Sequence, residues 1–537
     1  MKRTRLSDIS QNQDEQLLDI TAEDLVPLPY PYDKPDEKTP VCSLTREQQD
    51  RYECSLDGVV AVGISKPKSK EEEEKLVKAF LNGLRKLLSK KDNWTFLQPL
   101  ILSLEYCARC NTCSEACPIY LASGKQEIYR PTYRSEVLRR IIKKYLNKSK
   151  VGKFLSKFTG SDIDLNWTTI ARLAELAYRC TICRKCAQVC PISLDNGLIA
   201  HELRKLFSQE MGISAKELHE LGTVQQLEVG ASTGLTPKAF KSIIQFMEDE
   251  IEEKTGKKMK IPVDKEGADI LILHNSGEFM SWLENPEAFA IIFEAAGLSW
   301  TLSSELAGYE ATNYGVWYDD VQLARIALKQ SEVARKLGVK KIVIGECGHS
   351  HKAAAVVADR VFTNETYIPR ESCMPVLEDI VFSGKLKLDP KRNDFPVTLH
   401  DPCNMVRLMG VVEPQRRILR KICPQFWEME PHGVENYCCG GGSGFAIMPS
   451  MNFPDWRSSV AGRMKLKQIL DTFQDVIDPS IKKYVCSPCS NCKGQLRDLF
   501  SYYNVWEKCG ILYGGLVELI VNAMVDIKEP FIEWEWR

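Results

Sequence analysis

Long apolar runs are scarce in this chain of 537 residues. The nearest candidate, ILYGGLVELIVNAMV at residues 511–525, contains Glu518 and falls short of the roughly 20 apolar residues that cross a bilayer. We expect a buried helix there and no transmembrane helix in the chain. The first residues, MKRTRLSDISQNQDEQ, are polar throughout, so we expect no secretory signal peptide.

An excess of charge of either sign is also missing. The chain has 71 basic and 72 acidic residues, which gives a net charge of −1. This balance argues against a protein that coats nucleic acid or attracts acidic substrates by charge. With 44% apolar and 27% charged residues the composition is that of a globular protein, and a typical domain size of about 150 residues suggests three or four domains.

Cysteine, by contrast, is abundant, with 20 residues. In a reducing compartment such thiols are more often metal ligands than disulfides. Two stretches, CARCNTCSEACP at 107–118 and CTICRKCAQVCP at 180–191, follow the pattern C-x2-C-x2-C-x3-C-P that binds 4Fe–4S cubane clusters. Zinc ribbons need only two C-x2-C pairs per ion, so two complete runs favour iron–sulfur clusters.

The spacing also predicts how the ligands are shared. Three thiolates on one tight loop can each bind one iron of a cube, and in two-cluster ferredoxins the fourth cysteine ligates the other cube. We therefore expect one cluster on Cys107, Cys110, Cys113 and Cys190, and the second on Cys117, Cys180, Cys183 and Cys186.

About sixty residues separate the two runs, and they have helical periodicity, as in SEVLRRIIKKYL and WTTIARLAELAYR. This arrangement resembles the α-helical ferredoxin domain of succinate dehydrogenase and heterodisulfide reductase iron–sulfur subunits. We expect that domain at residues 66–230, with a helix that opens on a capping box from Ser69 to Glu72. Residues 1–65 are rich in proline and are expected to be an extended segment.

From about residue 265 the pattern changes to short apolar runs (ADILILHN, KKIVIGE, PVTLHD) separated by helical stretches, which predicts an α/β fold with parallel strands. The region divides into two similar halves, 265–395 and 396–537, which we interpret as two Rossmann-like repeats. LILHNSGE matches VTLHDPCN, YEATNYGVW matches VENYCCGGG, and KIVIGECGHSHK matches KYVCSPCSNCK. The chain is thus predicted to be multidomain, an α-helical ferredoxin domain followed by this α/β region.

The repeat divides the remaining cysteines into one loaded and one depleted half. At the positions that align between the two halves, the first half has a single cysteine, Cys347. The second half has five cysteines at these positions: Cys403, Cys438, Cys439, Cys489 and Cys492. This register pairs Cys489 with Cys492. The rival pairing of Cys486 with Cys489 stays open, so Cys486 is also a candidate metal ligand.

The adjacent Cys438 and Cys439 are poor partners for one another in a disulfide, but they can ligate different irons of an opened cluster. Gly440, Gly441 and Gly442 follow directly. Glycines let the backbone approach a cluster and offer N–H groups to sulfur, so we count these three as cofactor-binding residues. The stretch lacks the lysine and spacing of a phosphate-binding loop.

The pattern C-x34-C-C-G followed by C-x2-C, with HDPC at its head, resembles the CCG motif of heterodisulfide reductase catalytic subunits. Residues 90–537 resemble the HdrD family, and in particular its DsrK-type members, which also load a single CCG half. The resemblance implies a special 4Fe–4S cluster in residues 396–537 where a disulfide or trisulfide is cleaved. It also implies that the electrons come from quinol through a cytochrome b-type (DsrM-like) membrane subunit, and that further Dsr complex subunits are partners. The implied substrate is a DsrC-like sulfur carrier. The implied location is peripheral, at the cytoplasmic side of the membrane.

We interpret Cys438 and Cys439 as catalytic ligands. Cys347 is a candidate for a relic ligand or a thiol that handles substrate, with a buried structural cysteine as the alternative. Three histidines are candidate proton donors, although structural hydrogen bonds explain them more simply: His349, His351 and His400. Rival functions are the electron-relay subunit of a glycolate- or lactate-type oxidase, a heterodisulfide reductase proper, and a non-catalytic scaffold.

Overall fold

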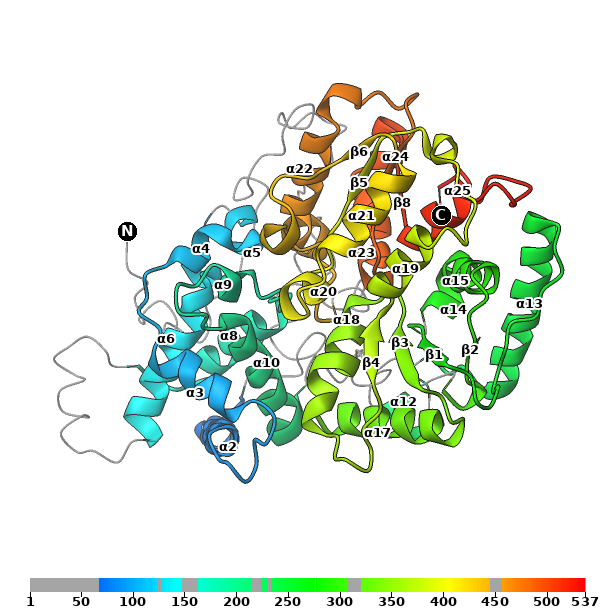
Figure 1. The fold of residues 1–537 in the computed structure, drawn as a ribbon. Helices are drawn as coiled ribbons and strands as arrows, with labels where there is room; N and C mark the ends of the chain where they lie inside the picture. The colour runs from blue at the N-terminus through cyan, green and yellow to red at the C-terminus, as the bar shows by residue number, and fades with distance from the viewer. Residues whose placement is uncertain are drawn as a thin grey trace. The chain divides into compact units, whose positions relative to one another are not determined.

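The computed structural model describes residues 67–123, 125, 127–146, 163–213, 224–229, 231, 233–275, 277–306, 320–444 and 456–536 (Figure 1). The chain forms two compact units. The first unit comprises Met1–His219, Trp317–Asp319 and Gly440–Met464, and the second comprises Glu220–Val316, Asp320–Cys439 and Lys465–Arg537. Residues 1–65, expected to be extended, lie outside the described residues. The grouping of Gly440–Met464 with the first unit departs from the expected continuous domain at 396–537.

The described residues of the first unit form helices and no strand. The helices are α2 (Lys70–Leu87), α3 (Leu97–Glu105), α4 (Thr112–Ala116), α5 (Pro118–Ala122), α6 (Pro131–Ile141), α8 (Trp167–Tyr178), α9 (Lys185–Gln188) and α10 (Asn196–Lys205). Short 3-10 or π segments occupy Glu127–Tyr129, Ile142–Leu146, Leu206–Glu210 and Arg457–Ala461.

Local sequence explains where these helices begin. Ser69 caps α2 as predicted, because its hydroxyl accepts a hydrogen bond from the Glu72 N–H at 3.3 Å. In the described part of the insert between the cysteine runs, α6 and α8 form where the periodicity predicted helices. Every residue of α8 is buried, and α10 packs against both α8 and α6. These helices form the frame that carries the two cysteine loops.

The second unit contains two four-stranded parallel sheets with matching strand orders, β2-β1-β3-β4 and β6-β5-β7-β8. The strands are β1 (Ile270–Leu273), β2 (Trp300–Thr301), β3 (Lys341–Ile344), β4 (Arg370–Ser372), β5 (Val397–Leu399), β6 (Phe426–Trp427), β7 (Lys483–Cys486) and β8 (Ile511–Gly514). In the centre of each sheet Ile270 pairs with Lys341 and Val397 pairs with Tyr484. The three apolar runs singled out in the sequence are therefore strands β1, β3 and β5.

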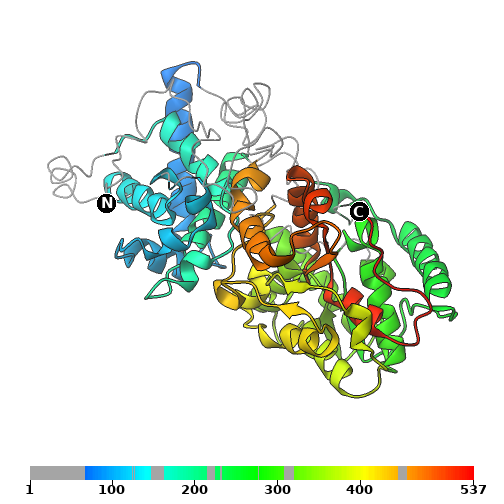
Figure 2. The ribbon, with the colours of Figure 1, turned by 90° about the horizontal axis from the view of Figure 1, so that it is seen from above.

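Helices surround both sheets. They are α12 (Gln226–Val229), α13 (Pro237–Thr255), α14 (Glu278–Ser281), α15 (Glu284–Ala295), α17 (Asp320–Lys336), α18 (Gly348–His351), α19 (Cys373–Phe382), α20 (Cys403–Leu408), α21 (Glu413–Ile422), α22 (Arg463–Thr472), α23 (Ser490–Tyr502), α24 (Val505–Cys509) and α25 (Leu516–Ala523). Helix α15 of the first half packs against α25 of the second, whereas α13 lies at the outer edge of this unit in both views (Figures 1 and 2).

The apolar stretch at 511–525 divides into β8 and α25, both buried. The expected buried helix is thus only the second part of it, since Gly514 and Gly515 end the strand first. Across the described part of the chain, no helix has the length and apolar character needed to cross a bilayer.

Candidate metal centres and redox site

The two cysteine loops of the first unit share one backbone conformation. Counted from the first cysteine of each run, the second and fourth residues after it have left-handed φ angles: 57° at Arg109 and 62° at Asn111, and 49° at Ile182 and 60° at Arg184. A β-branched residue such as Ile182 rarely adopts this conformation, so the surrounding structure must enforce it. The two loops therefore have equivalent backbone geometry, as expected of two loops with the same ligand spacing.

The thiols of the two runs interact with one another as well as within each run, and the crossed sharing of ligands stays a prediction. Cys113 interacts electrostatically with Cys117, Cys107, Cys110 and Cys190, and Cys117 interacts with Cys183 and Cys180. We call Cys107, Cys110, Cys113 and Cys190 the first cubane site, and Cys117, Cys180, Cys183 and Cys186 the second cubane site.

Burial, with the neighbouring thiols, raises the pKa of Cys113 to about 12. A buried group of thiols without metal remains protonated, and only metal binding makes several adjacent thiolates stable. The donor set therefore fits iron–sulfur clusters.

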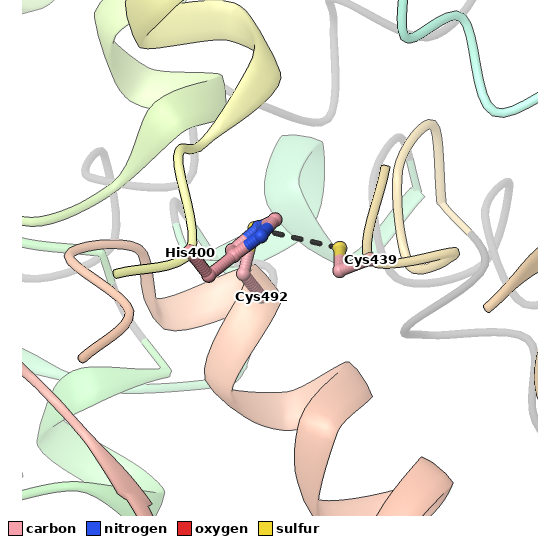
Figure 3. A group of neighbouring side chains, drawn as sticks. All are labelled: His400, Cys439 and Cys492. Carbon is pink, nitrogen blue, oxygen red and sulfur yellow. Dashed lines mark hydrogen bonds between the residues drawn. The ribbon is translucent and has the colours of Figure 1, made fainter. Parts of the chain in front are cut away.

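A second group of sulfur atoms lies inside the second unit. The Sγ atoms of Cys439 and Cys492 are 3.5 Å apart, and a ring nitrogen of His400 lies within 4.8 Å of both (Figure 3). Cys492 projects from α23, His400 follows β5, and Cys439 is the last residue of Asp320–Cys439, one of the three stretches of this unit. Three distant segments therefore converge at the carboxyl ends of β5 and β7, where ligands bind in α/β sheets.

Hydrogen bonds from Cys438 and Cys492, and from His400, lower the pKa of Cys439 well below its usual value. The same network raises the pKa of Cys492 above its usual value, through hydrogen bonds with Cys439 and Cys489. We call Cys403, Cys438, Cys439, Cys489 and Cys492 the cysteine-rich site.

Cys347 of the depleted half lies beside the cysteine-rich site. The amide N–H of Gly348, the next residue, donates to Cys489 Sγ at 3.2 Å. Around the Cys347 sulfur are three N–H donors: Asn491 Nδ2 at 3.3 Å, Ser350 N at 3.4 Å and Asn275 Nδ2 at 3.6 Å. The depleted half therefore supplies one wall of the site. Burial and the neighbouring Cys489 raise the pKa of the Cys347 thiol well above its usual value, although the hydrogen bond from Ser350 acts in the opposite direction.

Cys403 is the first residue of α20 and is buried. A Cβ atom on Gly348 would lie 3.2 Å from Pro402, 3.4 Å from Cys489 Sγ and 3.8 Å from Asn404. Pro402 and Asn404, which flank Cys403, therefore lie beside Gly348, and the Gly348 N–H donates to Cys489 Sγ. In the other half Gly277 occupies the matching position before α14, in agreement with the repeat. Asn313 and Tyr314, aligned with Cys438 and Cys439, lie outside the described residues.

The aspartate of the HDPC motif orders two of the three loops. Arg416 donates to both carboxylate oxygens of Asp401, at 2.8 and 2.6 Å, and both side chains are buried. Asp401 also accepts from the Gly433 N–H at 2.7 Å, and its carbonyl accepts from Asn436 Nδ2 at 2.7 Å. Asp401 therefore ties the loop before Cys403 to the loop before Cys438, a role that the sequence did not reveal.

Lys465 is a second residue that sequence reasoning missed. Its amine is buried and lies 2.5 Å from Asn436 Oδ1. Burial lowers the pKa of Lys465 to about 7, although Asp401, Cys439 and Cys438 act in the opposite direction. A lysine within a helical run carries no sequence signal that distinguishes it from a surface residue, so only the fold identifies it.

The three histidines differ in their surroundings. His351 is held structurally, with Nδ1 2.8 Å from the Cys347 carbonyl and Nε2 2.8 Å from Ser372 Oγ. His349 and His400 are buried and face sulfur. Burial lowers the pKa of each, while Cys489 and Cys439 raise that of His349 and Cys439 raises that of His400.

Cys486 requires a correction. It is the last residue of β7, is fully buried, and belongs to the apolar core rather than to the sulfur cluster. Cys489 and Cys492, the N-cap and first turn of α23, point to the site instead. Cys373 and Cys423 are also part of this core, and Cys509 is buried at the end of α24.

We predict that Cys486→Ser leaves the iron content unchanged, whereas Cys492→Ser lowers it by about four per chain, because only the latter removes a ligand of the third cluster. Iron analysis of the two anaerobically purified variants tests this. An equal loss in both would return Cys486 to the ligand set.

The glycines after the paired cysteines have a steric role. Gly440 has φ +95°, and a Cβ there would lie 2.5 Å from Gly462 N; a Cβ on Gly442 would lie 2.6 Å from the Thr181 carbonyl oxygen. Both contacts are within the first unit, so the close approach that requires glycine is to backbone.

Comparison with protein-family models gives two matches. Residues 103–194 match the family described as 4Fe-4S dicluster domain, and residues 397–497 match the family described as Cysteine-rich domain. Together with the clustered thiols, these matches mean that the chain holds two 4Fe–4S clusters in its ferredoxin-like part and a further 4Fe–4S cluster in its cysteine-rich part.

Curated relatives span most of the chain at low identity. Hdr-like menaquinol oxidoreductase iron-sulfur subunit 2 of Archaeoglobus fulgidus is 26% identical over 491 residues, which cover 83% of each chain. One subunit of the dihydromethanophenazine:CoB–CoM heterodisulfide reductase of Methanosarcina acetivorans is 27% identical, covering 74% of this chain and 89% of that protein. EtfAB:quinone oxidoreductase of Syntrophomonas wolfei is 23% identical, covering 74% of this chain but 55% of that protein. No solved structure matches.

Proposed function

We propose that this chain is the DsrK-like iron–sulfur subunit of a respiratory complex at the cytoplasmic face of the membrane, and that it reduces a sulfur–sulfur bond with quinol-derived electrons. A cytochrome b-type (DsrM-like) subunit supplies the electrons. The substrate is a disulfide or trisulfide on a small DsrC-like sulfur carrier. Reduction of a disulfide consumes two electrons and two protons and releases two thiols; run in reverse, the same site oxidises the thiols.

The observation that carries the proposal is the convergence of Cys439, Cys492 and His400 in a buried site. When bound there, an iron–sulfur cluster supplies stored electrons and an iron to which a substrate sulfur can bind. The protein supplies the thiolates that hold it and excludes water. The similarity to a subunit of a heterodisulfide reductase, an enzyme whose name states that it reduces a disulfide, supports the same chemistry.

His400 and His349 are the residues we propose as proton donors to the departing thiolates. Both are buried and face Cys439 or Cys489, so bulk water is not the proton source at these positions. His351 is excluded from this role because both of its ring nitrogens are engaged with Cys347 and Ser372.

The purified chain is expected to contain about twelve irons, four for each of three clusters. In the assembled complex, a reduced quinone analogue should drive the release of two thiols per disulfide, measured anaerobically with the sulfur carrier and with a small disulfide as separate substrates. Turnover of neither substrate, despite a full complement of iron, would contradict the proposal.

The main alternative is an electron-relay subunit, and the similarity to EtfAB:quinone oxidoreductase favours considering it. A relay would exchange electrons between quinone and a flavin partner without cleaving sulfur–sulfur bonds. The same assay distinguishes the two, because a relay reduces or oxidises added electron-transfer flavoprotein and releases no thiol.

A further inference from the structure

The segment after the paired cysteines belongs to a different unit from the cysteines themselves. Cys439 is the last residue of its stretch of the second unit, and Gly440–Met464 groups with the first unit. A peptide bond joins Cys439 to Gly440. Since successive Cα atoms are about 3.8 Å apart, the Cα atoms of Cys439 and Gly442 are separated by at most about 11 Å.

The start of this segment packs against the second cubane site. Gly442 approaches Thr181, which follows the ligand Cys180, so closely that a Cβ on Gly442 would lie 2.6 Å from the Thr181 carbonyl oxygen and 3.4 Å from its Cβ. Only glycine permits this approach.

Arg204 of α10 fixes the contact. Its Nη1 donates to both the carbonyl oxygen and the hydroxyl of Ser443, at 2.7 Å each. Its Nη2 donates to the carbonyl of Cys180 at 2.8 Å and to that of Tyr178 at 3.0 Å, and Nε donates to Ala177 O at 2.9 Å. One fully buried guanidinium thus bonds a cubane-ligand loop and the loop that follows the paired cysteines.

The contact requires an unfavourable backbone conformation at Ser443. Ser443 has φ +62°, an unfavourable conformation for a residue other than glycine. Burial lowers the pKa of Arg204 to about 10, which still leaves it charged at neutral pH. A strained backbone held by a buried charge indicates that the position of residues 440–444 matters more than local stability.

Residues 456–461, near the end of Gly440–Met464, contact helix α5 and Arg179, which adjoin the ligands Cys117 and Cys180 of the second cubane site. Residues Arg457–Ala461 pack against α5, which begins directly after the ligand Cys117. The Trp456 ring stacks under the Arg179 guanidinium at 4.5 Å and lies 4.9 Å from the Tyr129 ring. Both described ends of the segment therefore touch elements that carry ligands of the second cubane site.

The first cubane site is more open. Cys110 is exposed, and two exposed apolar side chains, Leu102 and Tyr106, precede Cys107. Ile192, which follows Cys190 by two residues, is also exposed.

We infer that residues 440–444 are a tether that, through the peptide bond from Cys439 to Gly440, couples the cysteine-rich site to the second cubane site rather than the first, and that Arg204 is its positioning residue. The inference rests on the proposed function. With clusters bound at both sites, each transfer would move one electron, so that the cluster at the second cubane site would be oxidised by one electron and the cluster at the cysteine-rich site reduced by one.

The test uses the full chain, purified anaerobically, as wild type, Arg204→Lys and Gly442→Ala. Lysine keeps the charge but cannot bond five acceptors, and the alanine Cβ forces Gly442 and Thr181 apart. Amide hydrogen exchange at residues 440–444 should accelerate by about ten- to a hundredfold in Arg204→Lys, the change expected for loss of a charge-assisted hydrogen bond.

Freeze-quench EPR after mixing with a reductant supplies the second readout. In both variants the cubane signals should form as in wild type, while the paramagnetic signal of the third cluster changes more slowly and reaches the same final amplitude. Arg134→Lys is the matched control. Arg134 is also buried and its Nη2 lies 3.7 Å from Cys180 Sγ, so this variant should shift the potential of the second cubane without exposing residues 440–444.

Unchanged exchange and an unchanged rate in either variant that folds would overturn the inference, and so would slowing in Arg134→Lys as large as in Arg204→Lys. If the wild type shows no third signal, the proposed function fails. The hydrogen exchange of residues 440–444 still decides in that case whether Arg204 holds the tether.

Discussion

Replacement of Cys439 by serine abolishes sulfur–sulfur cleavage and the paramagnetic signal of the third cluster, while both cubanes remain. Cys439 interacts with Cys438, Cys492 and His400, so its loss removes a ligand and disturbs Cys492 and His400 together. We expect activity to fall by at least about a hundredfold, because even residues that only orient metal ligands contribute ten- to a hundredfold.

The measurement is EPR together with iron analysis and quinol-dependent thiol release on the same sample. Cys423→Ser is the matched control, since Cys423 is equally buried but lies in the apolar core of the same half. Persistence of the third signal in Cys439→Ser would show that the cluster does not depend on the paired cysteines.

Arg416→Ala is expected to destabilise the second unit by about 3–5 kcal/mol, because it leaves the carboxylate of Asp401 buried without its charge partner. Arg416 and Asp401 are bonded through two parallel hydrogen bonds, and the Asp401 side chain has no solvent exposure. Anaerobic thermal unfolding should show a midpoint lowered by roughly 5–15 °C. The third cluster should be lost before the cubanes, since Asp401 orders the loops that precede Cys403 and Cys438.

The neighbouring Arg417 provides the control. It also forms a carboxylate pair, with Glu378, but at the surface of the same helix, where solvent screens the interaction. Arg417→Ala should therefore change the midpoint little. Equal effects of the two substitutions would show that the buried pair of Arg416 and Asp401 contributes no more to stability than the surface pair.

Much of this molecule follows from short-range patterns. The cysteine runs at 107–118 and 180–191 specify cluster loops because three ligands of each cluster lie within seven residues, and the left-handed residues at matching positions repeat in both. The strands β1, β3 and β5 were predictable because buried parallel strands are short apolar runs. The internal repeat predicted the second sheet, and the two sheets have the same strand order.

Other features were beyond the sequence for identifiable reasons. Cys486 and Cys492 both lie three residues from Cys489, and which of them reaches the site depends on where β7 ends, a boundary that sequence patterns do not fix. The roles of Asp401, Lys465 and Arg204 depend on partners more than ten residues away in the chain. An arginine in a helix has the same local pattern whether it faces solvent or a buried loop.

The sequence by itself therefore determined the kinds of cluster, the parallel α/β fold and the loading of one half, because local spacing and apolar periodicity are sufficient for each. Only the tertiary structure decided that Cys347 borders the cysteine-rich site, that Cys486 belongs to the apolar core, and that residues 442–443 and 457–461 pack with the cubane-bearing helices. The physical reason is that these outcomes depend on close packing between segments distant in the chain, where a single glycine contact or buried charge pair outweighs any local preference.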